Sequence, residues 1–130
     1  MSTAVRYYSR SGNTKALAEA IAAAAGVEAV SVDAENAPLT EPADTLFIGG
    51  ALYAYGIDRH MKEYLKSLKA GDAKRAVIFS TSWISKHALD LIRKGLEEAG
   101  IPAEAETFHV KNMPTEEQLK QAAAFAGKFL

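Results

Sequence analysis

The chain of 130 residues contains no cysteine. It therefore cannot form disulfides, bind metals or iron–sulfur clusters through thiolates, or use the cysteine nucleophile of a small phosphatase. It also lacks a long apolar run, because no stretch approaches the roughly 20 residues that a membrane-spanning helix requires. The N-terminus has no apolar core of a signal peptide. We therefore expect a cytoplasmic protein without membrane partners.

An excess of either charge is also missing. Fifteen lysines and arginines face sixteen aspartates and glutamates, which gives a formal net charge of −1, so nothing in the overall charge favours nucleic acid as a partner. The sequence contains neither GxxxxGK[ST] nor GxGxxG, which excludes a nucleotide P-loop and the dinucleotide fingerprint. His60, His87 and His109 have no ligand-like spacing, so we interpret them as surface or loop residues and expect no metal site.

Short apolar runs alternate with longer stretches of helical spacing. Hydrophobic residues make up 48% of the chain, enough for the core of one domain spanning residues 1–130. The runs predict five strands, at residues 4–8, 27–32, 45–49, 76–80 and 105–110. Such alternation predicts an α/β fold with a doubly wound parallel sheet, whose ligands bind beyond the carboxyl ends of the strands.

Helical spacing between these runs indicates where the helices lie. Apolar residues that share a helix face are Leu17 and Ile21; Met61, Leu65 and Leu68; Leu89, Ile92 and Leu96; and Leu119, Ala122, Ala126 and Phe129. Gly100 and Pro102 predict the end of the third helix. Thr115 and Gln118 predict a capping box at the start of the last one.

The loop after the first predicted strand reads SRSGNT, at residues 9–14. It is rich in hydroxyls and leads into a helix, where backbone N–H groups can bind the oxygens of a phosphate without a lysine. Gly12 would allow a close approach of the backbone. The alternative is that Ser11, Asn13 and Thr14 only cap the helix.

Aromatic residues follow the third and fourth predicted strands. Tyr53 and Tyr55 lie in the stretch GALYAYGID, and Trp83 lies in TSWISK. A flat, apolar ligand ring between the two loops would give these side chains a packing partner. The alternative is that they are ordinary, partly exposed aromatics.

SRSGNT resembles the phosphate loop of flavodoxins, in which (S/T)x(S/T)Gx(S/T) holds the phosphate of FMN. The similarity continues through residues 4–22, 45–68, 76–82, 108–110 and 114–130, and it is closest to short flavodoxin-like proteins without the long insertion in the last strand. The resemblance implies a three-layer αβα domain with a five-stranded parallel sheet in the order 2-1-3-4-5. It also implies FMN as the cofactor.

The resemblance assigns cofactor-binding roles and no catalytic residue. It implies that the phosphate is bound by Ser9, Ser11, Gly12, Asn13 and Thr14, with Arg10 contributing its amide. One side of the isoalloxazine would be flanked by Ala51, Leu52, Tyr53, Ala54, Tyr55 and Gly56, and the other by Thr81, Ser82, Trp83, Ile84 and Ser85. Tyr53, Tyr55 and Trp83 all remain candidates for stacking on the flavin ring.

The resemblance leaves three functions open. An electron carrier that serves unidentified redox partner proteins is favoured, because a compact chain leaves little material for a second substrate pocket. The alternatives are an FMN-dependent reductase or oxidase acting on a quinone, NAD(P)H or a porphyrinogen, and a binding module that has lost FMN. We expect a monomer or a weak homodimer.

Three charged residues need a structural account. Arg6 lies inside the first predicted strand, where a buried guanidinium needs a hydrogen-bonding partner. Asp58 and Glu63 flank a helix start, where we expect a cap and a solvated face rather than an acid–base pair. Both also lie close enough to the predicted flavin edge to form a local acidic rim.

Overall fold

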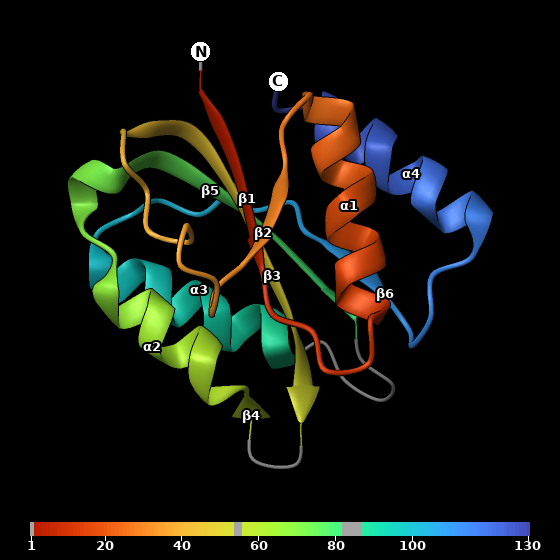
Figure 1. The fold of residues 1–130 in the computed structure, drawn as a ribbon, viewed down its shortest axis with the longest axis horizontal. Helices are drawn as coiled ribbons and strands as arrows, with labels where there is room; N and C mark the ends of the chain where they lie inside the picture. The colour runs from red at the N-terminus through yellow and green to blue at the C-terminus, as the bar shows by residue number, and fades with distance from the viewer. Residues whose placement is uncertain (1, 54–55, 82–86) are drawn as a thin grey trace.

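The computed structural model describes residues 2–53, 56–81 and 87–130, in which strands and helices alternate (Figure 1). The strands are β1 (Thr3–Tyr7), β2 (Ala29–Ser31), β3 (Ala43–Tyr53), β4 (Gly56–Ile57), β5 (Ala73–Thr81) and β6 (Phe108–Val110). The helices are α1 (Asn13–Ala25), α2 (Arg59–Ser67), α3 (His87–Ala99) and α4 (Glu116–Gly127), with a short 3₁₀ helix η1 (Ala70–Asp72).

Five strands form a parallel sheet in the order β2-β1-β3-β5-β6. This confirms the predicted order 2-1-3-4-5, because β4 stands outside that path. The short β4 was not predicted. It pairs antiparallel with the end of β3, with Leu52 opposite Ile57 and Tyr53 opposite Gly56. A strand of two residues carries no periodic signal, which is why the hydrophobic pattern did not reveal it.

Three of the predicted strand boundaries were wrong by three residues or more, and one of these is the start of β5, which lies at Ala73 rather than at residue 76. The strand predicted at 105–110 is only β6, because the chain touches β5 earlier, through a bridge between Ala76 and Ala103, and then leaves the sheet before Phe108. The strand predicted at 45–49 is much longer. β3 runs from Ala43 to Tyr53 because β5 pairs with it from Ala43 as far as Ala51.

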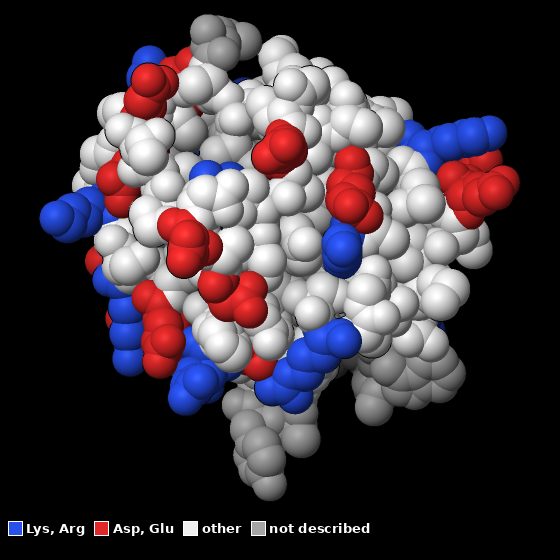
Figure 2. All heavy atoms as spheres, viewed as in Figure 1, with Lys and Arg blue, Asp and Glu red and all other residues white. Residues whose placement is uncertain are grey.

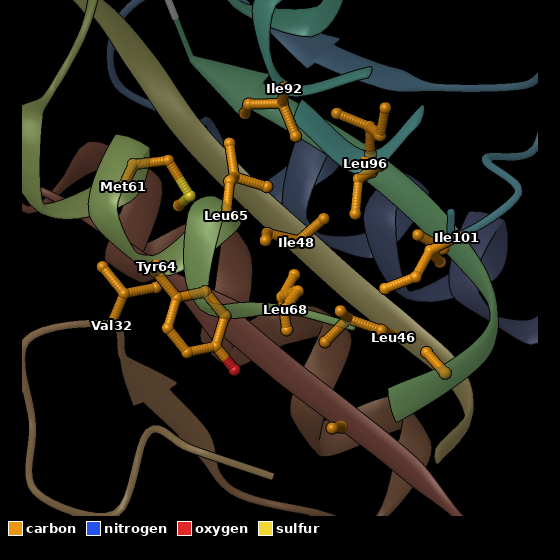
Figure 3. Packing of buried hydrophobic residues seen from close by; sticks show 14 of the residues in the cluster. Val32, Leu46, Ile48, Met61, Tyr64, Leu65, Leu68, Ile92, Leu96 and Ile101 are labelled. Atoms are coloured by element: carbon orange, nitrogen blue, oxygen red, sulfur yellow. The ribbon is translucent and has the colours of Figure 1, made fainter. Parts of the chain in front are cut away.

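Helices cover both faces of the sheet. Figure 1 shows α1 and α4 on one side and α2 and α3 on the other. Successive residues of β3 supply the two cores in turn: Phe47 packs with Val5 and Leu17, whereas Leu46 and Ile48 belong to the opposite core. Figure 3 shows that second core, in which side chains of α2 and α3 meet above β3. None of the described helices is both long and apolar enough to cross a bilayer.

The predicted helix boundaries are confirmed at α3 and α4. Gly100 follows α3 with φ +85°, and Ile101 N–H donates to the Leu96 carbonyl at 3.0 Å. At α4, Gln118 N–H donates to Thr115 Oγ1 at 3.1 Å, and Thr115 N–H donates to Gln118 Oε1 at 2.9 Å. Gly100 is therefore the predicted glycine stop of α3, and Thr115 with Gln118 forms the predicted capping box of α4.

Arg6 finds its partners among backbone carbonyls. Its Nε donates to the Ala37 carbonyl at 2.7 Å and its Nη1 to the Val5 carbonyl at 3.1 Å. The Tyr64 hydroxyl donates to the same Ala37 carbonyl at 2.9 Å. The buried guanidinium thus ties β1 to the segment after β2, and it forms no ion pair with a carboxylate of the described residues.

Candidate functional site

The carboxyl ends of β1 and β3 lie side by side, and the chain leaves them toward opposite faces of the sheet. β1 continues into α1 on one face, whereas β3 continues through β4 into α2 on the other (Figure 1). A crevice between two such connections is where doubly wound sheets bind ligands. The loop at residues 9–14 and the β3–β4 hairpin border this crevice.

The loop before α1 is shaped by Ser9 and Gly12. Gly12 N–H donates to Ser9 Oγ at 2.9 Å, and Gly12 has φ +95°, a value that L side chains rarely adopt. A Cβ on Gly12 would meet no atom within 4 Å, so the space beside it is open. Gly12 is also the N-cap of α1, and no side chain caps this helix. Ordinary side-chain capping therefore does not account for the hydroxyls of SRSGNT.

Backbone donors at this helix start have no acceptor. The N–H groups of Ser11, Asn13, Thr14 and Lys15 make no hydrogen bond within the described part of the chain. Within this loop, Ser11 and Gly12 are exposed to solvent. Unpaired N–H groups at the positive end of a helix dipole favour an anion with several oxygens.

Two side chains of the loop tie it to distant segments. Thr14 Oγ1 lies 2.6 Å from Thr81 Oγ1, and both residues are buried. Asn13 Nδ2 donates to Asn112 Oδ1 at 3.2 Å. Thr14 is therefore placed to offer its N–H to a ligand while its hydroxyl joins the ends of α1 and β5.

The segment predicted as a flavin-flanking loop is largely a hairpin. Ala51, Leu52 and Tyr53 belong to β3 and Gly56 belongs to β4, whereas Ala54 and Tyr55 lie outside the described residues. Gly56 has φ +107°, which favours glycine at this turn. Thr81 is the last residue of β5, and Ser82, Trp83, Ile84 and Ser85 also lie outside the described residues.

Arg10 covers Tyr53, a contact that the sequence did not reveal. The guanidinium carbon of Arg10 lies 3.8 Å from the centroid of the Tyr53 ring, within range of a cation–π interaction. Arg10 N–H also donates to the Tyr53 hydroxyl at 3.3 Å. Burial raises the pKa of Tyr53 above its usual value. The amide of Arg10, predicted to face the phosphate, is thus directed at Tyr53 in this structure.

Asp58 connects Arg10 to helix α2. Its side chain is only 6% exposed, and its Oδ2 accepts from Arg10 Nη2 at 2.6 Å and from Nε at 3.0 Å. Its Oδ1 accepts from the backbone N–H of His60 at 2.7 Å, as the N-cap of α2, and lies 2.8 Å from His60 Nδ1. Burial alone would raise the pKa of Asp58, but the hydrogen bonds from Arg10 and His60 outweigh it and lower that pKa below its usual value.

This arrangement confirms the cap predicted at Asp58. It also argues against an acidic rim there, because Arg10 neutralises the buried carboxylate. Glu63 is exposed, as predicted, and lies 3.9 Å from Arg59. Figure 2 shows acidic and basic side chains interspersed over the face in view, rather than a field of one sign. No local pattern reveals the ion pair, because its two residues stand 48 positions apart.

A pocket of about 350 Å³ lies beside the Arg10–Asp58 pair. Its lining residues are Arg10, Tyr53, Gly56, Ile57, Asp58, Arg59 and Lys62. This volume is within the range of small-molecule sites, roughly 300–1,000 Å³. The hairpin residues that the resemblance assigns to the flavin therefore border a ligand-sized space.

The histidines differ in part from the prediction. His87 is exposed at the start of α3, but His109 lies within β6, where its Nδ1 is 2.7 Å from the hydroxyl of buried Ser80. His60 stacks on Tyr8 with ring centroids 4.8 Å apart. His109 and His60 thus lie in a strand and a helix rather than in loops, and both are partly exposed. Within the described residues, no three acidic, histidine or cysteine side chains gather as metal ligands.

Comparisons with known proteins agree with this fold. The chain is similar to a flavodoxin from the domain Archaea, with a TM-score of 0.85 and 24% identity, covering 99% of this chain and 96% of that one. It is also similar to oxidised flavodoxin 1 from Bacillus cereus, with a TM-score of 0.81 and 20% identity, covering 98% and 95%. At these identities the likeness concerns the fold alone.

A larger protein contains a similar unit. For rubredoxin oxygen:oxidoreductase from Desulfovibrio gigas, the TM-score is 0.82 and the identity 18%, covering 98% of this chain but 34% of that one. No curated protein matched the sequence.

The sheet order and the loop at its switch point define a doubly wound α/β protein with a flavodoxin-like fold. The family model of the flavodoxin domain matches residues 4–129. The chain therefore belongs to the flavodoxin family, and the resemblance seen in the sequence is confirmed.

Proposed function

We propose that this protein binds FMN, with the phosphate held by the loop at residues 9–14. Membership of the flavodoxin family supports FMN as the ligand, because that family generally binds it. The observation that carries the proposal is the set of N–H groups at Ser11, Asn13, Thr14 and Lys15, which have no acceptor among the described residues and lie beside Gly12, a glycine with φ +95° and open space around it. These donors suit a phosphate dianion better than a neutral ligand.

Different segments of the chain would bind the phosphate and the ring of FMN. The Ser11 hydroxyl and the free amides would hold the phosphate, while the β3–β4 hairpin and the segment after Thr81 would enclose the ring. Bound FMN supplies the electron-transfer chemistry, and the protein supplies orientation, exclusion of water and tuning. Trp83, Tyr53 and Tyr55 all remain candidates for stacking, and Tyr53 would have to share its ring face with Arg10.

Calorimetric titration with FMN, riboflavin and inorganic phosphate tests the binding. We expect FMN to bind much more tightly than riboflavin. Ser11→Ala should cost about 1.5–3 kcal/mol of FMN affinity, the value of a hydrogen bond to a charged group, and leave riboflavin binding unchanged. Lys120→Ala, on the exposed side of α4, is the matched control. Equal affinities for riboflavin and FMN would refute the role of the loop.

We further propose an electron carrier that serves redox partner proteins. The full-length likeness to flavodoxins supports it, together with the short connections around the crevice. The alternative, an FMN-dependent reductase or oxidase, is favoured by one observation: Asp58 is neutralised by Arg10, so the acidic rim that would speed association with a basic partner is missing at this edge.

A reductive titration of the FMN-loaded protein separates these two functions. A carrier should take up electrons in two resolved one-electron steps and show negligible steady-state turnover with NADPH and a quinone. A single two-electron step with rapid quinone turnover would refute the electron carrier and support the FMN-dependent reductase. Free FMN at the same concentration is the control for uncatalysed quinone reduction.

A further inference from the structure

A second concave site lies between α2 and α3, on the outer side of the core. Its volume is about 400 Å³, again in the range of small-molecule sites. Its apolar lining includes Leu65 of α2, Leu68 just after α2 and Leu91 of α3. Leu65 and Leu68 are buried in the core, whereas Leu91 is partly exposed. Leu65 and Leu68 belong to the core cluster that Figure 3 shows, so the floor of the groove is the edge of the core.

Small residues on α3 create the hollow. Gly95 and Ala99 both line it, and residues four apart lie on the same face of a helix. A Cβ on Gly95 would lie 2.8 Å from Leu65 Cδ1, so the two helices approach closely at that point. The groove is therefore closed below by tight packing and stays open above the small side chains.

The rim of the groove is mostly positive. Lys62 and Lys66, one turn apart on α2, line it together with Lys94 of α3, and none of the three forms an ion pair with a described carboxylate. The only acidic lining residue is Glu98. Glu63 does not compensate these lysines, because it lies against Arg59.

The groove shares no residue with the loop at 9–14. The loop lies beyond the carboxyl end of β1, whereas the groove lies between two helices that cover one face of the sheet. The two regions meet at the β3–β4 hairpin, because Ile57 and Lys62 line both the groove and the pocket beside the Arg10–Asp58 pair. A ligand in the groove would therefore not occupy the proposed phosphate site at residues 9–14, although it would adjoin the pocket beside Arg10.

We propose that this groove binds an amphipathic carboxylate, a small molecule with an apolar chain or ring and one carboxylate group. The apolar part would lie on the partly exposed Leu91, Gly95 and Ala99, above the buried leucines of the core. The carboxylate would accept hydrogen bonds from the lysine ammonium groups. One negative charge fits better than several, because Glu98 on the rim repels a more highly charged group.

Sodium decanoate, below its micelle concentration, is the probe that tests this proposal. Amide NMR shifts of the ¹⁵N-labelled protein, recorded with and without FMN, should change at Gly95 and Ala99 and stay unchanged at Ser11 and Gly12. Decanol is the neutral probe of matched length. The FMN titration is a separate readout. Decanoate binding in the groove can therefore be refuted while FMN binding by the loop at residues 9–14 is supported, and the reverse also holds.

Variants separate charge from shape. Lys62→Gln combined with Lys94→Gln should weaken decanoate about three- to tenfold, as expected for one or two partly screened charge pairs. Ala99→Phe should block the site by filling it. Lys120→Gln on α4 is the control for lost surface charge and should leave decanoate binding unchanged.

Four outcomes would overturn the proposal. They are the absence of saturable decanoate shifts, equal binding of decanol and decanoate, unchanged binding in the lysine double variant, and shifts centred on the loop at 9–14. Vesicles of phosphatidylglycerol and phosphatidylcholine form the last arm. Binding to these vesicles without binding of free decanoate would assign the groove to a membrane surface instead.

Discussion

The Asp58 carboxylate holds together three segments at the edge of the crevice, which makes Asp58→Asn an informative substitution. Asparagine keeps an oxygen that can accept the His60 N–H at the start of α2. It removes the negative charge that Arg10 contacts at 2.6 and 3.0 Å. The substitution therefore tests the ion pair and spares the helix cap.

The expected loss follows from the hydrogen bonds. A bond to a charged group contributes about 1.5–3 kcal/mol and a neutral one about 0.5–1.5 kcal/mol. The partner Arg10 is 56% exposed, so water screens part of the difference. We expect Asp58→Asn to lower the free energy of unfolding by about 1 kcal/mol, or a few degrees in Tm for a chain of this size. Asp58→Ala should lose about 1 kcal/mol more, because the cap goes as well.

The pH dependence of this loss has a defined sign. The pKa of Asp58 is lower in the folded protein than its usual 3.8, so the carboxylate stabilises the fold above that value. The contribution disappears as the pH falls through the folded pKa. Urea unfolding of wild type and Asp58→Asn should therefore differ most at pH 7, and the difference should shrink as the pH falls below 3.8.

Glu63→Gln is the control, since it removes an exposed carboxylate from the same helix and should change stability by less than about 0.5 kcal/mol. A gap between wild type and Asp58→Asn that is the same at pH 7 and pH 3 would refute the reasoning. So would an Asp58→Asn protein as stable as wild type at pH 7.

Five further substitutions, in three experiments, test other parts of the fold. Gly12→Ala should lower the free energy of unfolding by about 1–2 kcal/mol, because it forces a side chain to adopt φ +95°, although the new Cβ would meet no other atom. Gly127→Ala within α4 should instead raise the free energy of unfolding by about 0.5–1 kcal/mol. Chemical unfolding measures both changes. Thr81→Val should lower Tm by several degrees in a thermal scan, because it leaves the buried Thr14 hydroxyl without its partner at 2.6 Å. Arg6 and Tyr64 both donate to the Ala37 carbonyl, so each single variant, Arg6→Met or Tyr64→Phe, leaves that carbonyl one donor. In a double-mutant cycle, the double variant should therefore lose more free energy of unfolding than the sum of the single losses. Additive losses in that cycle would contradict the shared acceptor.

The sequence predicted the sheet, the helices and the loop that leads into α1 because their signals are local. The apolar runs of β3 and β5 mark strands covered on both faces, and Thr115 with Gln118 marks a helix start within four residues. SRSGNT likewise carries its information in six neighbouring residues. Such patterns depend on the geometry of a single strand or helix, so they can be recognised before any packing is known.

Only the tertiary structure decided how these parts meet. Arg10 finds Asp58 across 48 positions, and Thr14 finds Thr81 across 67. The two residues of β4 were invisible to periodicity and became a strand only by pairing with the end of β3. The groove between α2 and α3 exists because Gly95 lets one helix approach Leu65 of the other. Contacts between distant residues depend on how whole elements pack, and no spacing within one segment encodes that packing.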